Sequence, residues 1–142
     1  MDKIPPFGVR PWNGVKPISR AFRIPLSGMS AQRQRMETIA TNLANVDTAF
    51  GPNGTPYQRQ VARLEAGRDG TVEVTGVDTL DTGFERVYDP DHPLADEDGY
   101  VRYPKIEIEQ EIADLMITRR MFEANATVFE AAKAMVRQSL DI

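Results

Sequence analysis

The last segment of the chain places the strongest limit on its fold. No proline or glycine occurs between Pro104 and Ile142, and apolar residues recur there in alternating steps of four and three. This pattern predicts one amphipathic helix over residues 106–142. At 1.5 Å per residue the helix would be roughly 50 Å long, well beyond the usual three turns. Eight of its ten stripe positions are apolar, and the ten are Ile108, Ile112, Leu115, Arg119, Phe122, Ala126, Phe129, Lys133, Val136 and Leu140.

The same helix carries a second apolar stripe, which consists of Ile117, Met121, Val128 and Met135. One short partner helix can cover a single stripe but not both of them. We therefore expect the second stripe to be an intermolecular surface.

An earlier segment supplies the partner helix. Met29, Met36 and Leu43 repeat every seven residues, and Pro25 suits the first position of a helix, where no N–H is needed. We predict a helix within 25–47 that packs antiparallel against 106–142 as a coiled-coil pair and forms the assembly domain. The expected seam of this pair consists of Met29, Met36, Ile39, Leu43, Ile112, Leu115, Phe122, Phe129, Val136 and Leu140.

Residues 48–105 are expected to form a small β-rich insert. Val72 and Val74 alternate with polar residues, as in a half-buried strand, and the dipeptide Asp69-Gly70 is a hairpin turn signal. The strands are expected near 57–65, 71–77, 83–88 and 100–104. The predicted fold class is therefore α+β, with long N- and C-terminal helices packed as an antiparallel coiled-coil pair around a small antiparallel β insert.

Residues 1–24 contain four prolines and two glycines among several basic residues. Such a stretch predicts an extended or disordered basic arm. It lacks the apolar core of a secretory signal peptide, and no window of the chain resembles a membrane span. If the protein functions outside the cytoplasm, it must therefore be exported by another route.

Cysteine is absent, which excludes disulfides, cysteine-ligated metals and thiol catalysis. The single histidine, His92, lies in an acidic loop with Asp89, Asp91, Asp96 and Asp98. These carboxylates could in principle bind calcium, but their spacing does not match an EF-hand loop. We expect a rigid, solvated turn and no metal site.

The other common chemistries also lack a motif. No serine is near His92 in the sequence, no nucleophile elbow or phosphate-binding glycine loop is present, and the net charge of −4 does not favour nucleic acid. We predict no catalytic residue, no cofactor and no enzyme activity. Spacing in the sequence does not show whether two carboxylates face each other as a catalytic pair. A periplasmic enzyme that acts on peptidoglycan is therefore kept as an alternative.

Two segments resemble the terminal helices of the flagellar axial proteins, the family of rod, hook and hook-associated subunits. The first, residues 27–48, is similar to the family's N-terminal signature and ends in Asn42, Ala44, Asn45 and Thr48. The second is similar to the C-terminal pattern and contains Glu123, Ala124, Asn125 and Lys133. Phe122 stands where the family commonly has tyrosine, and residues 1–24 precede the usual helix start.

The middle of the chain resembles the proximal rod branch of this family. The likeness is carried by the segment 54–59 and by residues of the acidic loop, namely Asp89, Pro90, His92, Pro93, Asp96, Gly99, Tyr100, Tyr103 and Pro104. Another axial rod subunit would share both terminal helices but should lack this loop.

The resemblance implies a structural subunit of the periplasmic rod of the bacterial flagellar basal body, exported by the flagellar type III system. It implies a helical homo- and hetero-oligomer that transmits torque and continues the export channel. The implied partners are other copies, other rod subunits, and the membrane-ring and export-gate proteins at the rod base, with neither nucleic acid nor a membrane span.

Overall fold

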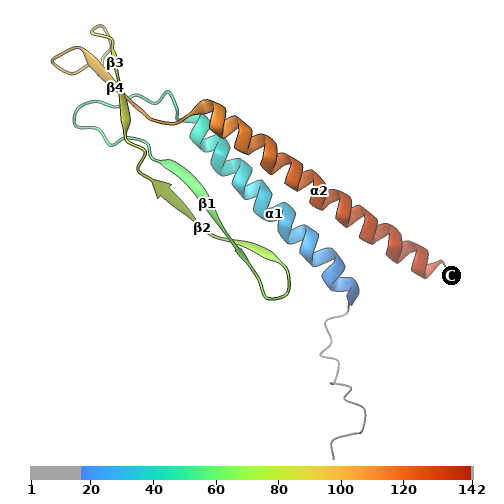
Figure 1. The fold of residues 1–142 in the computed structure, drawn as a ribbon. Helices are drawn as coiled ribbons and strands as arrows, with labels where there is room; N and C mark the ends of the chain where they lie inside the picture. The colour runs from blue at the N-terminus through green and yellow to red at the C-terminus, as the bar shows by residue number, and fades with distance from the viewer. Residues whose placement is uncertain (1–16, 142) are drawn as a thin grey trace, which may run out of the picture.

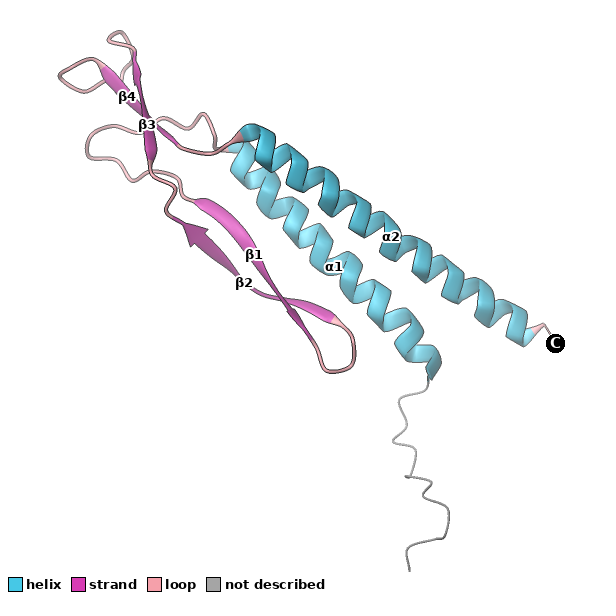
Figure 2. Ribbon diagram, viewed as in Figure 1, coloured by secondary structure: helices cyan, strands magenta, loops and turns pink. Residues whose placement is uncertain are grey.

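Two long antiparallel helices lie side by side and form the largest part of the molecule (Figure 1). The structure is a computed structural model that describes residues 17–141. Helix α1 spans Pro17–Ala44 and helix α2 spans Ile108–Leu140. The predicted α+β class is confirmed, since two small antiparallel sheets lie between the helices in the sequence (Figure 2).

Helix α1 begins earlier than its sequence pattern predicted. Residues 17–24 are helical, so the extended arm expected over 1–24 is wrong for this part, while residues 1–16 lie outside the described residues. Pro25 lies inside the helix with its side chain fully buried, although its ring removes one helical hydrogen bond. Tertiary packing offsets that loss, because the ring of Phe22 packs edge to face on Phe129, with the ring centroids 5.3 Å apart.

The β insert consists of two hairpins. Strands β1 (Arg59–Ala66) and β2 (Val72–Leu80) pair antiparallel, and so do β3 (Phe84–Tyr88) and β4 (Tyr100–Pro104). The predicted turn joins β1 to β2, with Gly70 at φ +85°, a left-handed conformation that favours glycine. A register shift follows Arg63 and marks a bulge in the first hairpin.

Helix α1 lies between helix α2 and the β1–β2 hairpin (Figure 1). The hairpin turn is bound to the beginning of α1 by polar contacts. Arg23 donates from Nη2 to Asp69 Oδ2 at 3.1 Å, and the Val72 N–H donates to Ser27 Oγ at 3.1 Å. These contacts make residues 17–27 part of the folded unit.

The apolar core is small and falls into two parts. Ala31, Ile39 and Ala62 are buried where α1 meets its neighbours. Val101 and Phe50 are buried at the base of the β3–β4 hairpin, where the Phe50 N–H donates to the Arg102 carbonyl at 2.9 Å. Many large apolar side chains remain exposed, so the single chain leaves much apolar surface uncovered.

The face of α2 that meets α1 differs from the predicted seam. Ile112 is 46% exposed and Leu140 is 78% exposed, so neither lies in it. Glu111 and Thr118 are buried there instead, seven residues apart. The apolar pattern does not predict this face because polar residues occupy part of it. The remaining predicted seam residues are buried or half-buried, namely Met29, Met36, Ile39, Leu43, Leu115, Phe122, Phe129 and Val136.

Gly28 allows α1 and α2 to approach closely. A Cβ atom at this position would lie 2.7 Å from both terminal atoms of the Asn125 amide. Asn125 is held in place because its Nδ2 donates to the Met121 carbonyl at 2.9 Å.

We predict that Gly28→Val lowers the free energy of unfolding by about 1–3 kcal/mol, because the added side chain overpacks the seam. Chemical denaturation monitored by circular dichroism measures the change. Adding Asn125→Ala should restore most of the loss, whereas Ser30→Val at an exposed position of α1 should have little effect. An unchanged stability of Gly28→Val would contradict the close approach.

Candidate functional site

The end of α1, the start of β1 and the first turns of α2 meet around one buried amide. Asn42 is 0% exposed. Its Nδ2 donates to the Gln60 carbonyl at 2.8 Å and to Glu111 Oε2 at 3.0 Å. Its Oδ1 accepts from the Gln60 N–H at 2.8 Å and from the Tyr57 hydroxyl at 2.9 Å. All of the amide's polar atoms are therefore paired, as burial requires.

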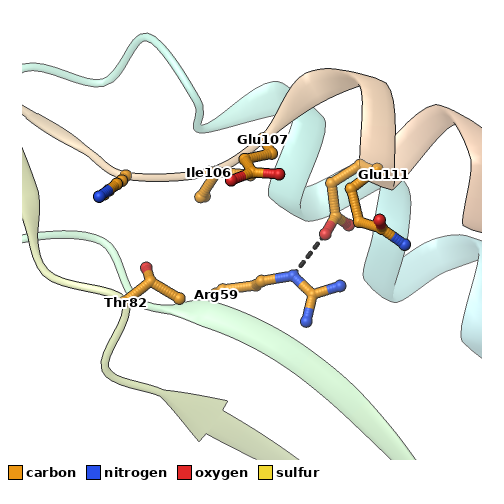
Figure 3. Close-up of a pocket in the computed structure, with 7 residues that line it drawn as sticks. Arg59, Thr82, Ile106, Glu107 and Glu111 are labelled. Carbon is orange, nitrogen blue, oxygen red and sulfur yellow. Dashed lines mark hydrogen bonds and ion pairs between the residues drawn. The ribbon is translucent and has the colours of Figure 1, made fainter.

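A buried carboxylate completes this group. Glu111 is 1% exposed, and its Oε1 accepts a hydrogen bond from Arg59 Nε (Figure 3). Arg59 also lies 3.5 Å from Asp114, measured from Nη2 to Oδ2. A buried charge is tolerated only when it is paired and hydrogen-bonded, and Arg59 and Asn42 meet both conditions. We call Asn42, Tyr57, Arg59, Gln60 and Glu111 the interhelical clamp.

Tyr57 is affected by the same surroundings. Burial raises the pKa of its hydroxyl above the usual value, and the nearby charge of Glu111 raises it further. The neutral hydroxyl is therefore favoured, which keeps its proton available as the donor to Asn42.

A cavity of about 300 Å³ opens beside the clamp (Figure 3). It is lined by Arg59, Thr82, Lys105, Ile106, Glu107, Gln110 and Glu111. The guanidinium of Arg59 is already paired with carboxylates, and the lining contains no histidine, serine or cysteine. The ion pair of Arg59 with Glu111 therefore joins the β insert to α2 at this cavity.

The acidic loop at the tip of the β3–β4 hairpin is closed by one carboxylate. Asp96 Oδ1 accepts from the N–H groups of Asp98 at 3.1 Å and Tyr100 at 2.9 Å, and Oδ2 accepts from Arg86 Nη2 at 3.0 Å. The hydrogen bond from Tyr100 lowers the pKa of Asp96, and Arg86 contributes in the same direction. Asp96 therefore caps the loop from within.

Other motif residues of this loop also have structural roles. Gly99 has φ +82°, and a Cβ there would lie 3.0 Å from the ring of Tyr88. His92 Nδ1 accepts from the Leu94 N–H at 3.1 Å, and the Asp89 N–H donates to the Gly99 carbonyl at 2.9 Å. Pro90 and Pro93 are exposed, Tyr100 and Tyr103 are half-buried, and Pro104 is buried. Within residues 17–141 no group of three or more histidine or acidic side chains is placed to hold a metal ion.

The remaining motif residues divide between packing and the surface. Asn45 ends α1, since its Nδ2 donates to the Thr41 carbonyl at 2.8 Å and its Oδ1 accepts from Thr48 Oγ1 at 3.3 Å. Asn125 fills the space beside Gly28. Three others have no packing role of this kind: Ala44 and Ala124 are exposed, and Glu123 forms an exposed pair with Arg119 at 2.9 Å. Lys133 lies 3.6 Å from Glu130.

The predicted second stripe lies open on the outside of α2. We call Ile117, Met121, Val128 and Met135 the outer stripe; their exposed fractions are 53%, 46%, 54% and 68%. Neither helix in the described part of the chain is long and apolar enough to cross a membrane. Exposed apolar residues that gather on one side of a helix are typical of interaction surfaces.

Comparison with known proteins accounts for both helices. Residues 22–49 match the family model described as flagella basal body rod protein, and residues 97–142 match the model described as flagellar basal body rod FlgEFG protein C-terminal. The flagellar basal-body rod protein FlgC of Aquifex aeolicus is 39% identical over 130 residues, covering 87% of this chain and 96% of that protein. The chain belongs to the FlgC family of flagellar basal-body rod proteins.

Two further FlgC proteins extend the likeness to distant bacteria. FlgC of Escherichia coli O157:H7 is 35% identical over 126 residues, covering 85% of this chain and 94% of that protein. FlgC of Bacillus subtilis is 34% identical over 143 residues, covering 86% of this chain and 95% of that protein. The resemblance to axial rod proteins is therefore confirmed.

Sequence reasoning missed most of the interhelical clamp. Asn42 and the segment 54–59 are predicted only as motif residues, and no contact is predicted between Asn42, Arg59 and Glu111. A usable signal was present, since Glu111, Thr118 and Asn125 recur every seven residues. A polar residue repeated at the coiled-coil period indicates a seam that contains hydrogen bonds.

We predict that Asn42→Asp destabilises the protein strongly at neutral pH, because it places a second carboxylate about 3 Å from Glu111 in a buried site. Lowering the pH should recover part of the loss, since the introduced carboxylate then binds a proton. Thermal unfolding at several pH values measures this. Asn45→Asp, at the half-buried end of α1, is the control and should show a much smaller pH effect.

We also predict that the Tyr57 hydroxyl ionises at a higher pH than an ordinary tyrosine, because its pKa is raised. The folded protein retains this proton at pH values where the unfolded chain, with a pKa near 10.0, has lost it. The resulting stabilisation is complete below that pH and is lost as the pH rises through the folded pKa. Absorbance titration of the phenolates should show a late step that Tyr57→Phe removes and Tyr88→Phe, at an exposed position, retains.

Proposed function

We propose that this chain is a structural subunit of the flagellar basal-body rod and that it acts by assembly through the outer stripe of α2, without catalysis. Membership of the FlgC family supports the rod assignment. The exposure of the outer stripe supports assembly as the mode of action, because the folded chain leaves this apolar surface uncovered.

The physical properties of the outer stripe favour a stable contact. Full burial of one large apolar side chain contributes about 1.5–3 kcal/mol, so four such residues can supply a substantial part of an interface. The outer stripe belongs to α2, whereas the β1–β2 hairpin lies against α1 (Figure 2). Contacts between unlike surfaces that do not close a ring generate a helical assembly. The natural partners are further copies and other rod subunits.

The predicted seam residues take two roles in this proposal. Leu115, Phe122, Phe129 and Val136 hold α2 against α1, where they are half-buried. Ile112 and Leu140 are exposed and would meet neighbouring subunits instead.

The finer placement follows from the likeness of the acidic loop to proximal rod proteins. We place the subunit in the proximal rod, where it would transmit torque and continue the export channel after export by the flagellar type III system. Its neighbours there would include the membrane-ring and export-gate proteins. Low-salt and high-salt crosslinking of basal bodies, followed by peptide mapping, would identify the neighbours of each face.

The experiment on the outer stripe uses the double variant Met121→Lys/Val128→Lys. We expect the thermal midpoint of the isolated subunit to change little, because both side chains are about half exposed. We expect swimming in soft agar and the yield of complete rods to fall to the level of a strain without the gene, since burying two charges in an interface is costly.

The matched control is Thr127→Lys, an exposed position on the polar side of the same helix. This variant should support swimming. Normal rods and normal swimming in the double variant would show that the outer stripe is not the assembly surface.

A further inference from the structure

A groove lies where the β3–β4 hairpin meets the segment after α1 and the start of α2. It has a volume of about 440 Å³. Its apolar lining includes Val46, Val87, Tyr103, Ile106 and Ile108. Val87 and Ile108 are 45% and 42% exposed, so the groove is open to solvent in the described part of the chain.

The charge of this groove is negative. Asp47 and Glu85 are the charged residues of its lining, and both are exposed. Neither carboxylate has an ion-pair partner within residues 17–141. The groove therefore suits an apolar segment that also carries a cation.

The outer stripe contains a segment with these properties. Ile117 is followed three residues later by Arg120 and four residues later by Met121, so the three lie next to one another on α2. Arg120 is exposed and has no ion-pair partner in the described part of the chain, whereas Arg119 is paired with Glu123. An arginine stem can lie on apolar surface while its guanidinium binds a carboxylate. This part of the outer stripe therefore complements the groove in both polarity and charge.

The two surfaces of one chain cannot meet each other. Ile108, which lines the groove, is the first residue of α2. Met121 lies more than three turns further along the same straight element, roughly 20 Å away along the helix axis. The segment that fills the groove must therefore come from a second molecule.

We propose that this groove receives the outer stripe of a second copy of the chain. Ile117 and Met121 of that copy lie against the apolar lining, and its Arg120 lies beside Asp47 and Glu85. Each copy then uses its groove for one neighbour and its outer stripe for another, so that contacts between unlike surfaces continue from copy to copy. This inference rests on the proposed assembly through the outer stripe and adds the surface that receives it.

Cysteine crosslinking tests the contact, since the chain has no cysteine of its own. A strain without the wild-type gene expresses two full-length chains, one with Val87→Cys and one, with an affinity tag, with Met121→Cys. Oxidation of isolated basal bodies with copper phenanthroline should join the two chains by a disulfide. The yield should be several-fold above that of the matched pair Val87→Cys and Thr127→Cys, because Thr127 is exposed on a different side of α2.

The outcomes separate this inference from the proposed function. Absence of the mixed disulfide, or disulfides only between two Met121→Cys chains, would overturn the groove as the receiving surface. The proposed function would stand in that case if Met121→Lys/Val128→Lys still abolished rod formation. Both would be overturned if that variant assembled normally and the mixed disulfide was absent.

A charge exchange gives a second measurement that needs no crosslinking. Arg120→Glu and Glu85→Arg should each reduce swimming in soft agar several-fold, since each places like charges across the contact. The combined variant should recover part of the loss. Arg137→Glu, at an exposed position near the end of α2, is the control and should not recover swimming when combined with Glu85→Arg. A combined Arg120→Glu/Glu85→Arg variant that swims no better than Arg120→Glu alone would contradict the proposed pairing.

Discussion

The fold depends on one side-chain amide that behaves like an additional peptide group. Asn42 exchanges two hydrogen bonds with the backbone of Gln60, as a neighbouring strand would, and turns its remaining donor to Glu111. These partners are 18 and 69 residues away in the sequence. The contact fixes where the first strand starts and where the last helix starts relative to α1. Because a buried amide without partners costs more than the net gain from one hydrogen bond, the three segments order together.

Several polar residues are buried beside the helices while several large apolar residues are exposed. Gln32, Thr118 and Glu111 are buried between or beside the helices, while Met121, Val128 and Met135 face outward. Hydrogen bonds and shape, including the space at Gly28, define the helix register. Much of the apolar surface of the described chain, by contrast, stays exposed.

The sequence predicted the elements whose limits are set locally. The β3–β4 hairpin, expected near 83–88 and 100–104, is found at Phe84–Tyr88 and Tyr100–Pro104, and the long helix expected over 106–142 is found at Ile108–Leu140. The positions of proline and glycine and the period of the apolar residues are sufficient to predict these elements. The sequence does not predict the start of α1 because Pro25 also suits the first position of a helix. Contacts with the distant Phe129 and Asp69 support the helix before Pro25. The clamp was missed because the partners of a buried polar residue depend on tertiary structure.

The β1–β2 hairpin has a consequence for how such subunits avoid aggregation. A two-stranded sheet leaves both outer edges without a neighbouring strand, and crowded identical chains could pair there indefinitely. Charged residues cover this hairpin: Arg63 pairs with Asp78, while Glu65 and Glu73 stand directly opposite each other. A second hairpin placed edge to edge would bring like charges together, and the bulge after Arg63 would disturb its alignment. These two features disfavour the pairing of such hairpins edge to edge.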